Sequence, residues 1–182
     1  MSLTKTPICD FGKKAENFQL NSTDNKIISL NDIKGEKGTL IMFICNHCPY
    51  VKGVINRLVK DIEKIQKIDI GCVAIMSNNV EQYPEDSFEN MKIFATKNNF
   101  TFPYLIDDTQ KVAKDYGAVC TPDFFGFNNK LELQYRGRLD NSGISGEELT
   151  EKELLNAMNQ IANTGLGPKK QIASMGCSIK WR

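Results

Sequence analysis

The chain lacks long apolar runs and a strong net charge. No stretch approaches the ~20 apolar residues that a membrane-spanning helix needs, and the N-terminal segment has no apolar signal core. We therefore expect a cytoplasmic protein with no membrane partner. The formal net charge of +1 gives no electrostatic reason to expect nucleic acid as a partner.

The sequence also has few residues that could bind a metal in closely spaced pairs. His47 is the single histidine, and the six cysteines include one close pair, Cys45 and Cys48. A structural zinc site usually takes two such pairs, so we expect no metal, and nothing in the sequence implies a bound cofactor. Without a secretory signal the cysteines should be reduced, which makes any disulfide here transient and catalytic rather than structural.

What the chain does contain is an alternation of strand and helix patterns. Residues 39–44 and 71–76 are apolar runs typical of strands buried on both faces. Between them, apolar residues recur every three or four positions from 51 to 65, which predicts a long helix. We expect one α/β domain, residues 8–164, with a central mixed sheet flanked by helices, an N-terminal strand extension, and an irregular C-terminal tail (residues 165–182) packed on it.

Further elements follow from capping and turn residues. Residues 86–89 and 150–153 match capping boxes, which predict that two more helices begin there. Residues 123–127 and 131–138 are expected to be strands joined by an Asn-Asn turn. In such a sheet the chemistry lies beyond the carboxyl ends of the strands, which is where the loop 45–48 falls.

Pro49 decides which cysteine heads the long helix. If Cys45 were the N-cap, Pro49 would be the fourth helical residue and would clash with a carbonyl four residues back, at a cost of about 3 kcal/mol. If Cys48 is the N-cap, Pro49 is the first helical residue, where its missing N–H costs nothing. Cys48 then meets unpaired N–H groups and the positive end of the helix dipole, so we interpret it as a reactive thiolate.

Several stretches resemble the thioredoxin-fold redoxins, specifically the AhpC/TSA family and its peroxiredoxin-like subgroup. The stretch ENFQLNSTDNKIISLNDIKGEKGTLIMF is similar to the N-terminal signature of that family, and FICNHCPYVKGVINRL resembles its active-site strand, loop and helix. YPEDSFENM, YGAVCTPDFF and the terminal GCSIKW are similar to further marks of the subgroup. The resemblance spans about residues 8–182 and implies a thioredoxin-like fold.

The resemblance also implies roles for particular residues. Cys48 takes the leading nucleophile position of the thioredoxin motif, while Val51 stands where thioredoxins have their second cysteine. Thr121 and Pro122 match the cis-proline loop that faces the nucleophile, so Thr121 would present its backbone to a thiol substrate.

Four other residues are candidates beside Cys48. Cys45, Cys120 or Cys177 could resolve a sulfenic acid or mixed disulfide on Cys48, or each could simply be a packed cysteine. His47 could tune the thiolate or shuttle a proton, or it could fill the place of the thioredoxin tryptophan.

Arg136 is a weaker candidate. It alternates with Arg138 along one face of an expected strand, where it could hold a thiolate or a substrate anion. A solvated strand face is the competing interpretation.

Two functions remain open on the sequence. The first is a thiol oxidoreductase with antioxidant-type activity, in which Cys48 attacks a disulfide or hydroperoxide and an external thiol reductant of the thioredoxin or glutathione type supplies electrons. The second is a catalytically inactive thioredoxin-fold binding module. The missing peroxiredoxin signature Pro-x-x-x-Thr-x-x-Cys and the missing second thioredoxin cysteine favour the second. The sequence does not indicate an oligomeric state.

Overall fold

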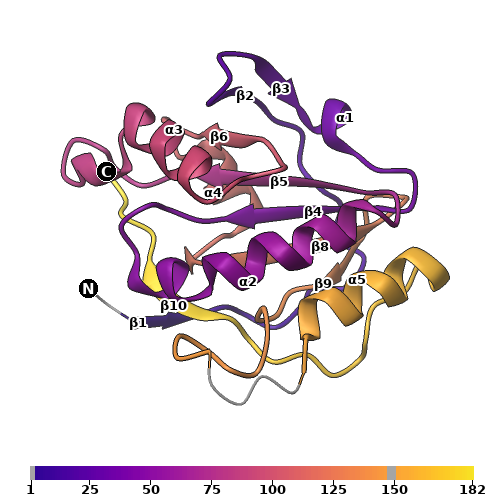
Figure 1. Ribbon diagram of the computed structural model, residues 1–182. Helices are drawn as coiled ribbons and strands as arrows, with labels where there is room; N and C mark the ends of the chain where they lie inside the picture. Colours follow the sequence, from indigo (N-terminus) through magenta and orange to yellow (C-terminus); the bar gives the residue numbers. More distant parts are fainter. Residues whose placement is uncertain (1–2, 147–150) are drawn as a thin grey trace.

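A seven-stranded mixed sheet forms the centre of the computed structural model, which describes residues 3–146 and 151–182. The strand order is β3-β2-β6-β5-β4-β8-β9, with β4, β5 and β6 parallel and the other pairs antiparallel (Figure 1). The strands are β2 (Gln19–Ser22), β3 (Ile27–Ser29), β4 (Gly38–Phe43), β5 (Ile70–Met76), β6 (Tyr104–Ile106), β8 (Asp123–Asn128) and β9 (Leu133–Tyr135).

The central strand β4 is buried on both faces, as its apolar run predicted. Leu40 and Met42 belong to the hydrophobic cluster on one side of the sheet, and Ile41 and Phe43 to the cluster on the other. This alternation is the period of two that a strand imposes on its side chains. Two cores therefore share one sheet.

Helices cover both faces of the sheet. Side chains of α2, α3 and α5 enter one core, while those of α1 and α4 enter the other. The long helix predicted from the spacing of apolar residues is α2, which lies in front of the sheet in Figure 1. The helices are α1 (Leu30–Ile33), α2 (Pro49–Gln66), α3 (Phe88–Lys97), α4 (Lys111–Tyr116) and α5 (Glu153–Thr164), with a 3-10 turn η1 (Pro84–Asp86) before α3.

The expectation of an irregular tail is wrong in one important place. Residues 175–178 form β10 (Met175–Ser178), the middle strand of a second sheet ordered β1-β10-β7. Its neighbours are β1 (Leu3–Lys5) and β7 (Cys120–Thr121), both antiparallel to it. This small sheet lies beside the N-terminal end of α2 (Figure 1), so a strand from the start of the chain and one from its tail meet where chemistry was expected.

Several element boundaries differ from the sequence prediction. The N-cap of α3 is Ser87, whose hydroxyl accepts from the N–H of Asn90 at 3.5 Å, and not Asp86. The strand β9 ends at Tyr135, earlier than expected. The N-cap of α5 is Lys152 and the helix begins at Glu153, two residues later than expected from the proposed cap at Thr150, which lies outside the described residues.

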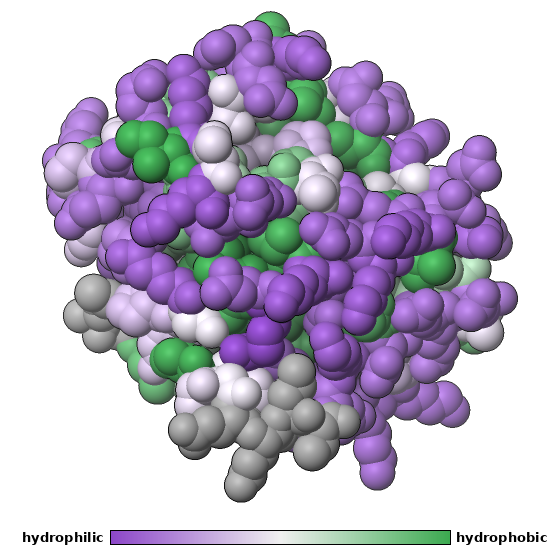
Figure 2. All heavy atoms as spheres, viewed as in Figure 1, coloured by the Kyte–Doolittle hydropathy of each residue, from purple (hydrophilic) through white to green (hydrophobic). Residues whose placement is uncertain are grey.

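Polar side chains cover most of the face seen in Figure 2, with apolar groups scattered between them. Within residues 3–146 and 151–182, no helix combines the length and the apolar character needed to cross a bilayer. Large apolar side chains are mostly gathered in the two cores instead.

Candidate functional site

Cys48 is the N-cap of α2, as Pro49 required. Its backbone is extended, with φ −62° and ψ 123°, and Pro49 is the first helical residue. The strand β4 ends at Phe43, so the loop that follows carries Cys45 just beyond the carboxyl end of the central strand. This confirms the prediction that Cys48 caps the helix while Cys45 follows the strand.

Three cysteine side chains meet beside Thr121 and Pro122, whose peptide bond is cis. The Cys48 Sγ lies 3.2 Å from the Thr121 carbonyl oxygen, and the Cys45 Sγ lies 3.3 Å from the Thr121 hydroxyl. The pairing of β10 with β7 sets Cys177 opposite Thr121, and from there its thiol hydrogen-bonds to Cys48. All three cysteines are free thiols. Residues distant in sequence thus form one thiol cluster of Cys45, Cys48 and Cys177.

Hydrogen bonds in the thiol cluster favour a thiolate at Cys48. The Cys45 thiol contributes most, and the Cys177 thiol and the N–H groups of Val51 and Cys177 add to it. Against the desolvation that burial imposes, these donors lower the pKa of Cys48 from 9.0 to about 4. The Thr121 carbonyl acts in the opposite direction, because it accepts only from the protonated thiol. Four donors outweigh one acceptor, so Cys48 is the nucleophile of the cluster.

The other two cysteines of the cluster remain protonated. Burial, the hydrogen bond to Cys48 and the charge of Asp86 raise the pKa of Cys45 well above its usual range. Burial and the hydrogen bond to Cys48 raise the pKa of Cys177 to about 11, although Lys180 lowers it. The cluster therefore holds one thiolate and two thiol donors.

A buried carboxylate, Asp86, organises the loop before Cys48. Its Oδ1 accepts from the backbone N–H groups of Asn46 and His47, at 2.8 and 3.1 Å. Its Oδ2 accepts from Asn78 Nδ2 at 2.8 Å and contacts His47 Nδ1 at 2.6 Å. Asp86 is fully buried, and its hydrogen bond raises the pKa of His47. The imidazole stacks on Tyr83, with ring centroids 5.2 Å apart.

Sequence reasoning missed Asp86 because it stands directly before the Ser87 cap and was taken as part of a capping box. Asn78, whose amide donates to Asp86, and Tyr104, whose hydroxyl donates to Asn46 Oδ1 at 3.0 Å, were missed as well. Polar residues in buried loops give no periodic signal. The proximity of Asp86 to His47 arises only from the fold.

Two candidate residues hydrogen-bond to groups outside the thiol cluster. The Cys120 thiol lies 3.7 Å from the Pro122 carbonyl, and burial raises its pKa above the usual range. Arg136 is not on a solvated strand face: it is buried and bonds both carboxylate oxygens of Asp123, at 2.9 and 3.3 Å. Arg138 instead pairs with Glu153 of α5, because β9 has ended and the expected alternation does not continue.

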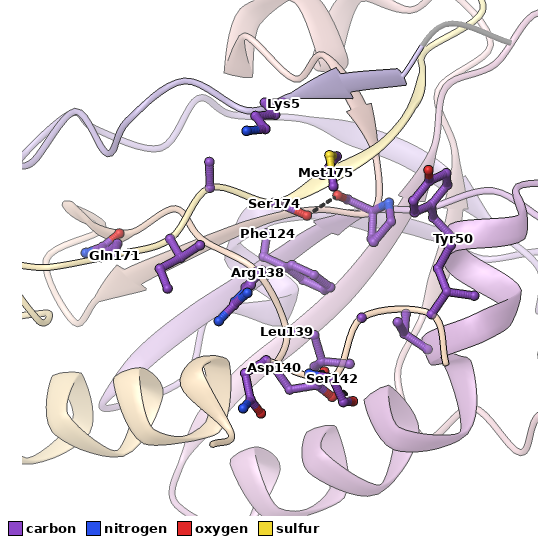
Figure 3. A pocket seen from close by; sticks show the side chains of 17 residues that line it. Lys5, Tyr50, Phe124, Arg138, Leu139, Asp140, Ser142, Gln171, Ser174 and Met175 are labelled. Carbon is purple, nitrogen blue, oxygen red and sulfur yellow. Dashed lines mark hydrogen bonds between the residues drawn. The ribbon is translucent and has the colours of Figure 1, made fainter. Parts of the chain in front are cut away.

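Cys48 has no solvent-exposed surface, and Cys177 is only 3% exposed. A cavity of about 780 Å³ nevertheless opens close by, bordered by Tyr50, Pro122 and Met175 (Figure 3). Its walls are largely apolar, and Phe124 lies at its centre in the view of Figure 3. The cavity reaches residues that flank the thiol cluster without reaching the sulfur of Cys48.

Cys45, His47 and Asp86 are the residues within 3–146 and 151–182 whose ligand atoms are grouped closely enough to hold a metal, all within 4.8 Å. The Asp86 carboxylate already accepts from four donors, and its contact with His47 leaves no space for an ion between them. A cation would have to displace these hydrogen bonds. The arrangement fits an ion pair better than a metal site.

The model of the AhpC/TSA family matches residues 11–137 of this chain. No curated protein matches. Among solved structures, an uncharacterized conserved protein from Geobacillus kaustophilus is 44% identical, with a TM-score of 0.94, over 100% of this chain and 97% of that chain. A hypothetical protein from Sinorhizobium meliloti is 32% identical, with a TM-score of 0.93, over 98% of both chains.

More distant structures share the fold. The peroxidoxin BcpB from Mycobacterium tuberculosis is 12% identical, with a TM-score of 0.65, over 86% of this chain and 99% of that chain. Similarity of this kind confirms the thioredoxin-like fold expected from the sequence. The family model covers most of the chain and includes the Cys48 loop and the cis-proline, so the chain belongs to the AhpC/TSA family of thiol oxidoreductases.

Proposed function

We propose that this protein is a thiol oxidoreductase in which Cys48 is the nucleophile and Cys177 the resolving thiol. The observation that carries the proposal is the thiol cluster: the helix-capping Cys48 lies with Cys45 and Cys177 beside the cis-proline, and hydrogen bonds from both thiols lower its pKa. A thiolate with a protonated thiol beside it is the arrangement that thiol–disulfide exchange needs.

The first step follows from the thiolate. The Cys48 sulfur attacks one sulfur of a substrate disulfide, forms a mixed disulfide and expels the other sulfur as a thiolate. With a hydroperoxide it attacks the terminal oxygen instead, giving a sulfenic acid and, after proton transfer, an alcohol. His47 of the same loop is the candidate proton donor, because Asp86 raises its pKa. A disulfide is the favoured substrate, because the chain lacks the peroxiredoxin signature whose threonine hydroxyl binds peroxide, and the Thr121 hydroxyl contacts Cys45 rather than Cys48.

The second step favours Cys177 over Cys45. Part of the rise in the Cys177 pKa comes from the charge and hydrogen bond of the Cys48 thiolate, and both disappear once Cys48 is in a mixed disulfide. Lys180 continues to lower the pKa of Cys177 in the mixed disulfide, whereas the charge of Asp86 continues to raise the pKa of Cys45. Cys177 therefore attacks the Cys48 sulfur, releases the substrate thiolate and leaves a Cys48–Cys177 disulfide. An external thiol reductant completes the cycle.

Titration of the thiolate tests the first half of this proposal. The absorbance of wild-type protein at 240 nm, minus that of Cys48→Ser, should rise with a midpoint near pH 4, because the lowered pKa keeps Cys48 ionised at every higher pH. This measurement needs no access to the buried sulfur. A midpoint near the ordinary thiol value of about 8.5 would contradict the proposal.

Disulfide mapping tests the second half and separates the enzyme from the binding module. After treatment with oxidised glutathione, peptide mass spectrometry should find a Cys48–Cys177 disulfide in wild-type protein. Cys177→Ser should accumulate glutathione on Cys48, while Cys120→Ser, the matched control, should behave as wild type. If Cys48 takes no adduct in any variant, the inactive binding module is the better description.

A further inference from the structure

The edge of β7 next to the cis-proline is occupied by the chain's own C-terminal strand. Two register pairs join the strands: Cys177 lies opposite Thr121, and Ser178 lies opposite Cys120. Beyond them the Ser174 hydroxyl donates to the Pro122 carbonyl at 2.7 Å. Residues 174–178 thus lie along the β7 edge, with Cys177 opposite the residue that precedes the cis-proline.

The contact is close enough to require a glycine. A Cβ added to Gly176 would lie 2.0 Å from the Thr121 carbonyl oxygen and 3.2 Å from Pro122 Cδ. Real Cβ atoms do not approach a backbone oxygen so closely, so any larger residue would push β10 away from β7. The sequence Gly176-Cys177 therefore lets the backbone approach Thr121 while the cysteine reaches Cys48.

Cys48 cannot be reached while β10 is in place. Its side chain has no exposed surface, and the neighbouring Cys177 is 3% exposed. A substrate sulfur has to contact the Cys48 sulfur directly for exchange to occur. Either β10 leaves, or the only disulfide that Cys48 can form is with a cysteine already in the cluster.

We propose that residues 174–178 are an exchangeable occupant of the β7 edge, which shields Cys48 until an extended, cysteine-bearing polypeptide takes its place. The proposal rests on the function proposed above and names its substrate class. When β10 leaves, the backbone of Thr121 becomes an unpaired strand edge, which an incoming strand can pair with. Close approach to Thr121 demands a small residue directly before the reactive cysteine of the partner.

The cavity beside the edge extends this docking surface. It is bordered by Tyr50, Phe124 and Leu139, which offer apolar contacts to side chains that alternate with the cysteine. Lys5 of β1 also borders it and is exposed (Figure 3). The partner segment should therefore carry apolar side chains on the face that lies against this cavity.

Departure of the strand is also linked to His47. The backbone of Lys180, two residues beyond β10, donates to Asn78 Oδ1 at 2.9 Å and accepts from Asn79 at 2.8 Å. The amide of Asn78 donates in turn to Asp86, which bonds His47. A hydrogen-bonded chain therefore joins the end of the tail to the loop that carries the nucleophile.

Alkylation of the full-length protein tests whether the strand covers Cys48. In Gly176→Ala, iodoacetamide should modify Cys48 at least tenfold faster than in wild type, with the modified residue identified by mass spectrometry. Lys170→Ala, an exposed change in the same tail, should match wild type. Ser174→Ala removes the bond to Pro122 and gives a milder opening if Gly176→Ala fails to fold. Equal rates in wild type and both opened variants would overturn the proposal.

Two peptides test the kind of partner. The probe is the peptide Ala-Ser-Met-Gly-Cys-Ser-Ile-Lys, its cysteine joined to thionitrobenzoate. Attack by the Cys48 thiolate forms a Cys48–peptide disulfide and expels coloured thionitrobenzoate with the electron pair of the broken S–S bond. With Gly176→Ala protein, this peptide should react at least fivefold faster than one with alanine in place of its glycine. Equal rates would overturn docking at the β7 edge.

These outcomes stay separate from a failure of the proposed function. Moving β10 also removes the Cys177 donors that lower the pKa of Cys48, so each alkylation rate is divided by the ionised fraction of Cys48 found by absorbance titration of the same variant. An ordinary thiol pKa would therefore defeat the proposed function while leaving the ratio intact. A lowered pKa with no change in the ratio would defeat only the covering strand.

Discussion

The Cys48 thiolate depends on residues that lie far from it in the sequence. The Cys45 thiol and the Val51 N–H each lie three residues from Cys48 along the chain, but the Cys177 thiol and N–H come from the C-terminal tail. Helix capping alone gives a thiolate only the N–H groups of the first turn. The two additional thiols distinguish this site from a simple capped cysteine, and Cys48 has no exposed surface.

His47 offers a direct measurement of the buried carboxylate beside it. Because it is the single histidine, one imidazole titrates in an NMR spectrum. Asp86 raises its pKa above the ordinary 6.5, so Asp86→Asn should lower the midpoint, since desolvation then acts with less opposition. The exposed change Asp24→Asn is the control and should leave the midpoint unchanged. An unchanged midpoint in Asp86→Asn would contradict the His47–Asp86 ion pair.

The same ion pair has a consequence for stability. A histidine whose pKa is higher in the folded than in the unfolded state stabilises the fold fully below the unfolded value of 6.5. That contribution is lost as the pH rises through the folded pKa. The difference in unfolding free energy between wild type and Asp86→Asn should therefore be larger at pH 5.5 than at pH 8.5.

At the scale of elements, strongly periodic segments were predictable and short polar ones were not. The spacing of apolar residues identified α2, and Pro49 fixed its first residue, because proline tolerates few positions in a helix. The strand β10 escaped notice because four residues that include a glycine carry no alternating pattern, and their pairing with β7 is a long-range contact. Asp86 escaped because its local sequence fits a helix cap equally well.

The central strand β4 contains one polar side chain whose removal should stabilise the protein. Thr39 is fully buried, and its hydroxyl has no hydrogen-bond partner within the described residues. Thr39→Val keeps the shape and removes the desolvated hydroxyl, so urea unfolding should show a gain of about 1 kcal/mol. Thr39→Ser keeps the hydroxyl and loses a methyl group, and should cost about 1 kcal/mol. A loss of stability in Thr39→Val would mean that the hydroxyl is satisfied.

The molecule as a whole has one large sheet with a core on each face and a small sheet at one end. The tail contributes to both cores: Cys177 belongs to the cluster that contains α2, and Ile179 to the opposite one. The tail is therefore integrated into the fold, yet its strand β10 has only the short strands β1 and β7 as partners. Exchange of this strand requires that the small sheet open without the large one.

Native-state hydrogen exchange can establish whether the two sheets open independently. Amides of β4 are paired between β5 and β8 and should exchange only through global unfolding. The amide of Ile179, bonded to the Val119 carbonyl at 3.1 Å, should exchange through a smaller opening, with a free energy lower by about 2 kcal/mol or more. Gly176→Ala should lower the opening free energy of the Ile179 amide further. The opening free energy of the β4 amides should still equal the free energy of global unfolding. Equal free energies for Ile179 and β4 would mean that the tail leaves only when the whole protein unfolds, which no substrate exchange at Cys48 could use.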